Sequence, residues 1–186
     1  MKIFLDKKFL TIIFIGIILR VFAIYFYGDS EVDNEWAIML NNLEQEKILS
    51  VRSIDGISVP NIFMPPLYPI FLYLIKLPLI TSDYYLDVVF LIQLLISVIS
   101  IYLTHKILLE IFSINESYIG STLFALFPLN IYAVSQISSI TLQIFLINLF
   151  LFSYLKYFKK IELLNSFLFS ISSALLILLR GEFFIF

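Results

Sequence analysis

The sequence predicts an all-α, polytopic membrane protein with about five transmembrane helices, and its composition is the first reason. Hydrophobic residues make up 61% of the 186 residues, and the mean hydropathy is +1.00. A soluble domain is nearer half apolar and arranges its apolar residues in stripes, whereas this chain has runs of about twenty. The net charge of −2 offers no basic surface, so we expect no nucleic acid as a partner.

Residues that commonly bind metals or form cross-links are scarce. The chain has no Cys, which excludes disulfides and thiolate metal sites, and its single His argues against a histidine-based site. We therefore expect neither a metal ion nor a bound cofactor.

The first span is expected at residues 9–27, directly after lysines at positions 2, 7 and 8. At about 1.5 Å per residue, this run covers a hydrocarbon core of about 30 Å. It ends in Tyr25, Phe26 and Tyr27, an aromatic belt typical of the membrane interface, so we interpret it as an uncleaved helix and not as a signal peptide. The basic start places the N-terminus in the cytoplasm.

Four more spans are expected after a long interruption, at residues 87–109, 117–133, 140–157 and 162–183. Pro128 is expected to kink the second of these near its outer end. The chain then forms a single transmembrane domain over residues 1–186. Because it stops within an apolar run, we expect it to be part of a longer protein.

Residues 62–80 are apolar, yet two observations argue that they do not cross the membrane. Prolines at positions 65, 66, 69 and 78 leave only a short helical run between them. If this segment crossed, the lysines at positions 106, 156, 159 and 160 would lie outside, against the positive-inside rule. We therefore expect a re-entrant or interfacial helix, which leaves residues 28–86 as one loop on the outer face of the inner or plasma membrane.

The first part of this loop has the pattern of a surface helix. Trp36, Met39, Leu40 and Leu43 recur at helical spacing, with polar residues between them. Such a short amphipathic helix lies in the membrane interface. Asp33 stands where its N-cap should be. Residues 48–61 are interpreted as an irregular connection.

Four carboxylates gather at the start of the loop: Asp29, Glu31, Asp33 and Glu35. One interpretation is an ordinary solvated loop, with Asp33 serving as a helix cap. The other is that a carboxylate at the interface takes a proton from a bound acceptor, helped by a low-dielectric surface that raises its pKa. The sequence pattern leaves both open.

Arg20 is the one charged residue inside the first span. Its long side chain could snorkel to the headgroups. Alternatively, it could hold an anionic lipid phosphate beside the loop, because charges inside spans usually have a function. Both hypotheses place its guanidinium near the outer surface.

Three motifs together resemble a known family. They are Asp33-Asn34-Glu35-Trp36, then Pro65-Pro66-Leu67-Tyr68-Pro69, then Leu126-Phe127-Pro128-Leu129-Asn130-Ile131-Tyr132. With the basic start and the Arg-bearing first span, this order resembles the N-terminal half of membrane glycosyltransferases of the GT-C superfamily. That superfamily includes the protein mannosyltransferases and the lipid A aminoarabinose transferases. The resemblance covers essentially the whole chain.

The resemblance implies an activity and a set of site residues. Such enzymes transfer a sugar, with inversion, from a polyprenyl-phosphate donor on the outer face to a lipid, glycan or protein hydroxyl. The general base would be Asp33, with Glu35 as second choice. Pro66 and Tyr68 would shape the wall of the site next to the base. Arg180 would contact the donor phosphate, and Glu182, two residues later, would also belong to the substrate-binding residues. The lipid-linked sugar would be a co-substrate, and no cofactor is implied.

The alternative function is a non-catalytic lipid or glycan flippase, or a transporter subunit. Transporters usually carry polar groups and broken helices at mid-membrane depth. In this sequence the carboxylates of the loop stand outside the expected spans, which favours interfacial chemistry.

Overall fold

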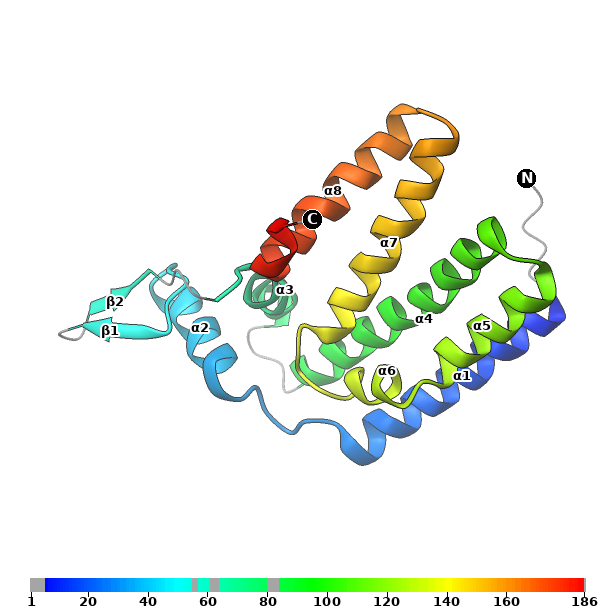
Figure 1. The fold of residues 1–186 in the computed structure, drawn as a ribbon. Helices are drawn as coiled ribbons and strands as arrows, with labels where there is room; N and C mark the ends of the chain where they lie inside the picture. The colour runs from blue at the N-terminus through cyan, green and yellow to red at the C-terminus, as the bar shows by residue number, and fades with distance from the viewer. Residues whose placement is uncertain (1–5, 55–56, 61–63, 80–83, 186) are drawn as a thin grey trace.

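The computed structural model describes residues 6–54, 57–60, 64–79 and 84–185. Almost all of its regular structure is helical (Figure 1). In chain order the elements are α1 (Lys7–Tyr27), α2 (Asn34–Gln45), β1 (Arg52–Ile54), β2 (Ile57–Val59), α3 (Leu67–Lys76), the 3-10 helix η1 (Leu77–Leu79), α4 (Tyr85–Ile111), α5 (Ile114–Leu126), α6 (Pro128–Ala133), α7 (Ile140–Lys159), α8 (Leu163–Leu179) and the 3-10 helix η2 (Gly181–Ile185).

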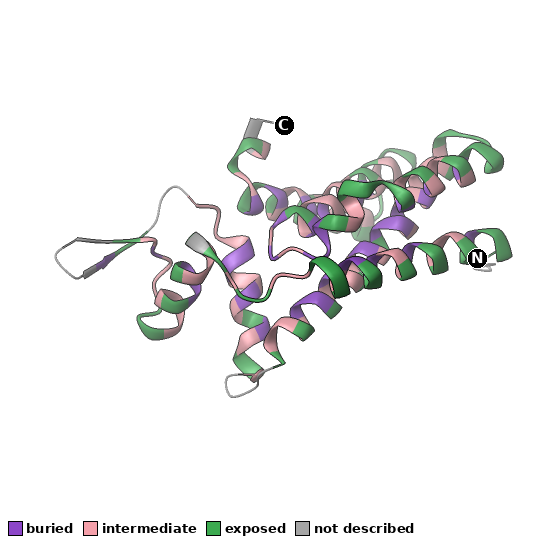
Figure 2. Cartoon of the chain, turned by 90° about the horizontal axis from the view of Figure 1, so that it is seen from below, coloured by how far each residue is buried: buried purple, intermediate pink, exposed green. Residues whose placement is uncertain are grey.

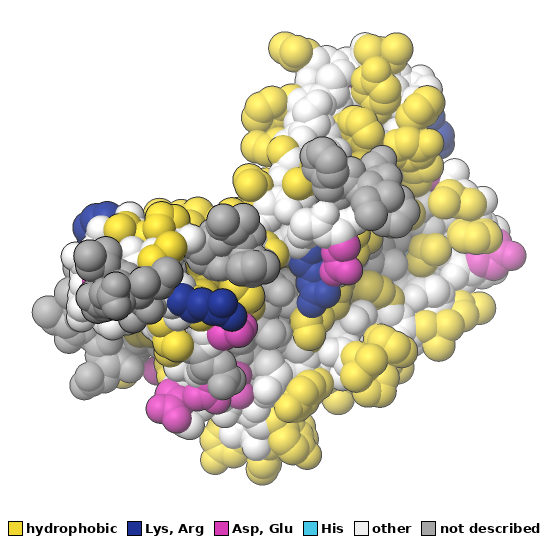
Figure 3. Space-filling view, turned by 60° about the vertical axis from the view of Figure 1, so that its left-hand side comes forward, with side chains coloured by type: hydrophobic (Ala, Val, Ile, Leu, Met, Phe, Trp, Pro, Cys, Tyr) yellow, Lys and Arg dark blue, Asp and Glu magenta, His cyan; other side chains and the backbone are white. Residues whose placement is uncertain are grey.

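Among the described residues, three helices are long and apolar enough to cross a membrane: α1, α4 and α7. The fold is therefore consistent with an all-α membrane protein. Large apolar side chains such as Phe14, 63% exposed, and Leu123, 67% exposed, cover the outside of the bundle. Figure 3 shows hydrophobic side chains spread over much of the visible surface, while the charged ones gather in a few clusters. This surface suits lipid better than water.

The expected span at residues 117–133 is not one helix, because it divides into α5 and α6 at Phe127 and Pro128. Phe127 is extended, with φ −64° and ψ 118°, and Pro128 opens α6. A proline disfavours helical backbone in the residue before it, which explains the break. The prediction of one continuous, kinked helix is therefore wrong, because the structure has two shorter helices here.

The hydrogen bonds and contacts of α1 show that it runs antiparallel to α4. Phe9 stacks on the ring of His105, with their centroids 4.0 Å apart, near the start of α1. Further along, Arg20 bonds to Ser97. In addition, α4 packs on α5 and α7, and α7 packs on α8. The end of α1 and the start of α4 consequently lie at the same end of the bundle.

The segment that joins α1 to α4 stays at this end (Figure 1). It contains α2, the β1–β2 hairpin and α3. The 10 residues of α3 rise about 15 Å, half of the about 30 Å of a hydrocarbon core. Residues 61–63 and 80–83, at the edges of the proline-rich stretch, lie outside the described residues. The short α3 agrees with a helix that does not span by itself.

The connection expected to be irregular at residues 48–61 contains an antiparallel hairpin instead. Arg52 pairs with Val59, Ser53 with Ser58, and Ile54 with Ile57. The two residues between the strands in the sequence are Asp55 and Gly56. Asp-Gly is a strong signal for a two-residue hairpin turn, and our sequence interpretation overlooked it.

The main core lies where α2 and α3 meet α4, α7 and α8. Its buried members include Leu40, Tyr68, Leu72, Phe90 and Leu146. Figure 2 shows buried residues concentrated where the helices face one another. This core fixes the surface helix α2 and the short helix α3 to the long helices, and so positions the loop that carries the carboxylates.

Candidate functional site

Asp33 and Glu35 stand at the start of α2, as the sequence predicts. Asp33 is the N-cap residue, with extended backbone (φ −95°, ψ 165°), but its side chain makes no capping hydrogen bond. Both side chains are exposed. Among the described residues, neither carboxylate has an ion-pair partner within 4.0 Å. Their carboxylates are therefore open to solvent or to a ligand.

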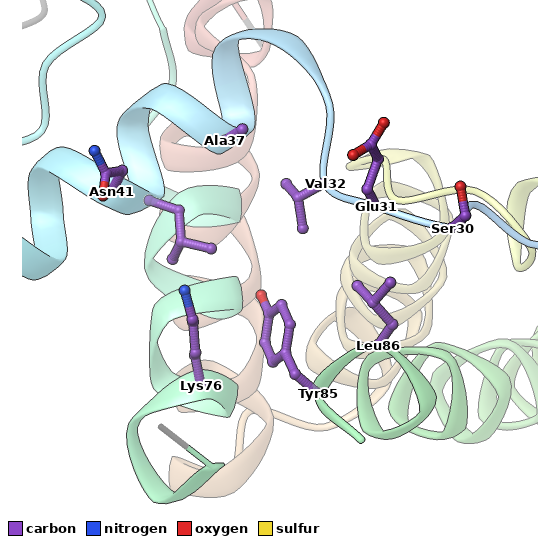
Figure 4. A pocket seen from close by; sticks show the side chains of 9 residues that line it. Ser30, Glu31, Val32, Ala37, Asn41, Lys76, Tyr85 and Leu86 are labelled. Carbon is purple, nitrogen blue, oxygen red and sulfur yellow. The ribbon is translucent and has the colours of Figure 1, made fainter. Parts of the chain in front are cut away.

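A hollow of about 320 Å³ lies beside this helix start. Its lining comes from the loop before α2, from α2 itself, and from the ends of α3 and α4: Ser30, Glu31, Val32, Ala37, Leu40, Asn41, Lys76, Tyr85 and Leu86. Figure 4 shows Glu31 and Ser30 on the loop, with Lys76 and Tyr85 side by side below α2. Glu31 is thus the acidic residue of this lining, with its carboxylate pointing away from Tyr85 and Leu86 in Figure 4. Asp33 and Glu35 follow it on the same segment.

Lys76 supplies the positive charge of this hollow. Its ammonium lies 5.8 Å from the centre of the Tyr85 ring and 2.7 Å from a carboxylate oxygen of Glu44. A lysine ammonium is a compact charge that suits phosphate oxygens. Sequence reasoning placed Lys76 outside the membrane but did not name it as a site residue. The signal was available, because a lysine inside an apolar segment usually has a specific environment.

Tyr68 is not among the residues that line the hollow. It is 1% exposed, and the Trp36 ring stands edge-on to it at 5.0 Å. Its hydroxyl has no partner among the described residues. Burial raises the pKa of the Tyr68 phenol well above its usual range, and the charges of Tyr85 and Asp29 act in the same direction. Pro66, the N-cap residue of α3, is half-buried and is also not part of this lining.

Asp29 connects the loop to a distant turn, which the sequence pattern did not predict. Its carboxylate accepts a hydrogen bond from the backbone N–H of Ile137 at 2.6 Å, and its own N–H donates to the carbonyl of Ser135 at 3.1 Å. The Gln136 side chain donates back to the carbonyl of Tyr27 at 2.8 Å. These bonds join the loop to the turn between α6 and α7, across more than a hundred residues of sequence.

Arg20 is enclosed in the bundle, so the expectation that it snorkels is wrong. Its exposed fraction is 0%. Nε donates to Oγ of Ser97 at 2.7 Å, and Nη1 donates at 3.0 Å to the carbonyls of Gly16 and Ala125. The small residues Gly16 and Ala125 leave room for the guanidinium between α1, α4 and α5. A lipid phosphate would have to enter the bundle to reach it.

Arg180 and Glu182 lie just after α8. They form an ion pair with each other at 2.9 Å, and their side chains are 40% and 65% exposed. Figure 1 shows the end of α8 close to α3, so the pair lies at the same end of the bundle as the hollow. No described contact joins it to the residues that line the hollow.

Taken together, the described residues form a helical protein with three helices long and apolar enough to cross a membrane, and with a hollow lined in part by Glu31 and Lys76 at one end of the bundle. Comparisons with known proteins add no identification. No family model matches the chain, and no curated protein or solved structure matches it either. The GT-C resemblance therefore continues to depend on the motifs themselves.

Proposed function

We propose that this chain is a membrane glycosyltransferase, or a part of one. It transfers a sugar from a polyprenyl-phosphate donor to a hydroxyl of a lipid, glycan or protein. The single observation that carries the proposal is the hollow beside α2. Its lining includes one acidic residue, Glu31, and one basic residue, Lys76, and two further exposed carboxylates follow at the adjoining helix start.

The chemistry requires a base for the acceptor and a cation for the leaving group. Asp33, or Glu35 as second choice, accepts the proton from the acceptor hydroxyl. The acceptor oxygen then forms a bond to the anomeric carbon while the bond from that carbon to the phosphate oxygen breaks. The electron pair leaves with the polyprenyl phosphate, and Lys76 stabilises the charge that develops there.

The proposed placement in the membrane follows from the charges at the two ends. The end opposite α2 carries six described lysines: Lys7, Lys8, Lys106, Lys156, Lys159 and Lys160. The positive-inside rule assigns that lysine-rich end to the cytoplasm and the hollow to the outer face. Crossing helices would be α1, α4 and α7, together with the shorter α5–α6 and α8, which gives the five spans of the sequence prediction.

The flippase or transporter alternative has one observation in its favour. Polar side chains line one buried side of α4, namely Gln93, Ser97, Ser100 and His105, and Arg20 lies against them without a described carboxylate partner. Buried polar groups within transmembrane helices often mark transport pathways. Because of these buried polar side chains, the experiment tests transport of the donor as well as transfer of the sugar.

The experiment uses the purified protein in proteoliposomes with a labelled lipid-linked sugar. Transfer releases polyprenyl phosphate and labels the acceptor, whereas transport moves the intact donor between leaflets. Asp33→Asn should lower transfer by at least about 100-fold, the lower bound for a general base. Glu46→Gln, which neutralises an exposed carboxylate at the other end of α2, is the matched control. Intact donor movement without cleavage would contradict the proposal.

A further inference from the structure

A second hollow lies on the other side of Lys76, and the transfer reaction does not use it. Its volume is about 190 Å³, and it is lined by Glu44, Lys47, Tyr73, Lys76 and Leu77. It opens between the end of α2 and the end of α3. Since a water molecule occupies about 30 Å³, this space can hold a group several times larger.

Lys47 is held in an unusual conformation at this hollow. Its φ of 60° is in the left-handed region, which non-glycine residues uncommonly adopt. Lys47 follows the C-cap residue Glu46, a position where helices often end in this conformation. Its ammonium donates to the backbone carbonyl of Glu44 at 3.1 Å and to the Tyr73 hydroxyl at 3.0 Å. It lies 5.4 Å from the centre of the Tyr73 ring. No described carboxylate forms an ion pair with it.

Glu44 is the carboxylate partner of the second lysine, Lys76. Its Oε1 lies 2.7 Å from Nζ of Lys76, yet this buried oxygen accepts no hydrogen bond from the described residues. The pair therefore has the distance of an ion pair without the alignment of a strong one. Two ammoniums and one carboxylate leave the hollow with a net charge of +1, which matches an anion of charge −1.

The surroundings of the hollow favour an anion attached to an apolar chain. Leu77, 43% exposed, forms part of the wall, and Leu74, 59% exposed, lies one turn earlier on α3. A soluble anion would gain nothing from these side chains. A membrane amphiphile would place its headgroup between the lysines and its chain against the leucines.

We infer that this hollow binds the monoanionic phosphodiester of an anionic phospholipid, with Glu44 as the internal competitor for Lys76. The two non-bridging phosphate oxygens are shared between the ammoniums of Lys47 and Lys76, and the Tyr73 hydroxyl donates to one of them. Glu44 moves away as the phosphate arrives. The bound lipid thereby anchors α2 and α3 to the membrane surface. Lys76 is also the cation of the proposed transfer reaction, but the lipid binding inferred here is tested without turnover.

The test measures lipid binding without turnover. Purified protein in neutral detergent is titrated with phosphatidylglycerol, and the bound lipid is counted by native mass spectrometry. Lys47→Gln should weaken phosphatidylglycerol binding about fivefold. This factor corresponds to the loss of about 1 kcal/mol, the contribution of one cation near an anionic lipid surface. Lys47→Arg, which keeps the charge, should retain it. Lys160→Gln at the lysine-rich end is the control for general charge loss and should leave this binding unchanged.

The decisive variant is Glu44→Gln, which should tighten phosphatidylglycerol binding several-fold because it removes the competitor. A merely structural role of the Glu44–Lys76 pair predicts weaker binding instead. The inference is overturned if Glu44→Gln fails to tighten binding, or if Lys160→Gln weakens it as much as Lys47→Gln does. Soluble glycerophosphoglycerol should compete poorly, and equal competition would contradict the role of the apolar chain.

Discussion

Ser97→Ala is the substitution whose effect on stability the structure specifies best. Oγ of Ser97 accepts a hydrogen bond of 2.7 Å from Nε of Arg20, and Arg20 is 0% exposed. Removing this hydroxyl leaves a charged N–H donor buried without its acceptor. The guanidinium has no spare capacity to compensate, because Nη2 already lacks a partner among the described residues.

The size of the effect follows from two ranges. A hydrogen bond to a charged group contributes about 1.5–3 kcal/mol in soluble proteins, while bonds between membrane helices average about 0.6 kcal/mol and reach about 1.7 kcal/mol. Because the donor is charged and fully buried, Ser97→Ala should lower the free energy of unfolding by about 1.5 kcal/mol. The double variant Arg20→Met/Ser97→Ala removes both partners and should lose less than Ser97→Ala alone.

The assay is reversible unfolding in mixed micelles, followed by far-UV circular dichroism. Ser100→Ala is the matched control, because Ser100 is also buried and, among the described residues, its hydroxyl bonds to the Ile96 carbonyl of its own helix. Its change in stability should be close to zero. The reasoning is refuted if Ser97→Ala stays within about 0.3 kcal/mol of the unmodified protein, or if the double variant is the less stable of the two.

Two further predictions concern bonds outside the bundle. Asp29→Ala removes the acceptor for the Ile137 N–H and should cost about 1.5 kcal/mol, whereas Asp33→Ala, which removes no capping bond, should cost less than about 0.5 kcal/mol in the same unfolding assay. Equal losses would contradict the docking role of Asp29. The side chain of Ser113, and secondly its backbone N–H, donate hydrogen bonds that lower the pKa of Glu116. The ionised Glu116 therefore stabilises the start of α5 at pH values above the ordinary Glu pKa. This contribution is lost as the pH falls through the lowered pKa. In Ser113→Ala, which removes the side-chain hydrogen bond and keeps the backbone N–H, an NMR titration should show the pKa of Glu116 raised toward its ordinary value. An unchanged pKa would rule out the side-chain cause.

Patterns within single helices could be predicted from the sequence. The helix at residues 9–27 is confirmed as α1 (Lys7–Tyr27), and the amphipathic pattern starting at Trp36 is confirmed as α2 (Asn34–Gln45). In both cases the signal is local, since it consists of a long apolar run or of apolar residues at helical spacing. The apolar side of α2 packs on α3, with Met39 and Leu40 buried, so contacts with the rest of the protein hold this helix in place.

Contacts between distant segments could not be predicted in the same way. Arg20 meets Ser97, 77 positions later, because small residues on α1 and α5 leave space for its side chain. Asp29 binds the backbone of Ile137, 108 positions later. No local pattern encodes such pairs. The sequence therefore located the carboxylate-rich loop, but it did not distinguish the docked Asp29 from the free Asp33, or the enclosed Arg20 from the accessible Lys76.

We propose that residues 28–86 form one loop on the outer face, with both ends of the segment on the same side of the membrane. Because the chain has no Cys, single cysteines can report the side of each position. Glu35→Cys and Asp87→Cys flank α3, and both positions are exposed. Both should react with a membrane-impermeant maleimide in intact cells, while Lys159→Cys should react only after permeabilisation. Reaction of Glu35→Cys alone, with Asp87→Cys protected until permeabilisation, would mean that residues 62–80 cross the membrane and would contradict the account.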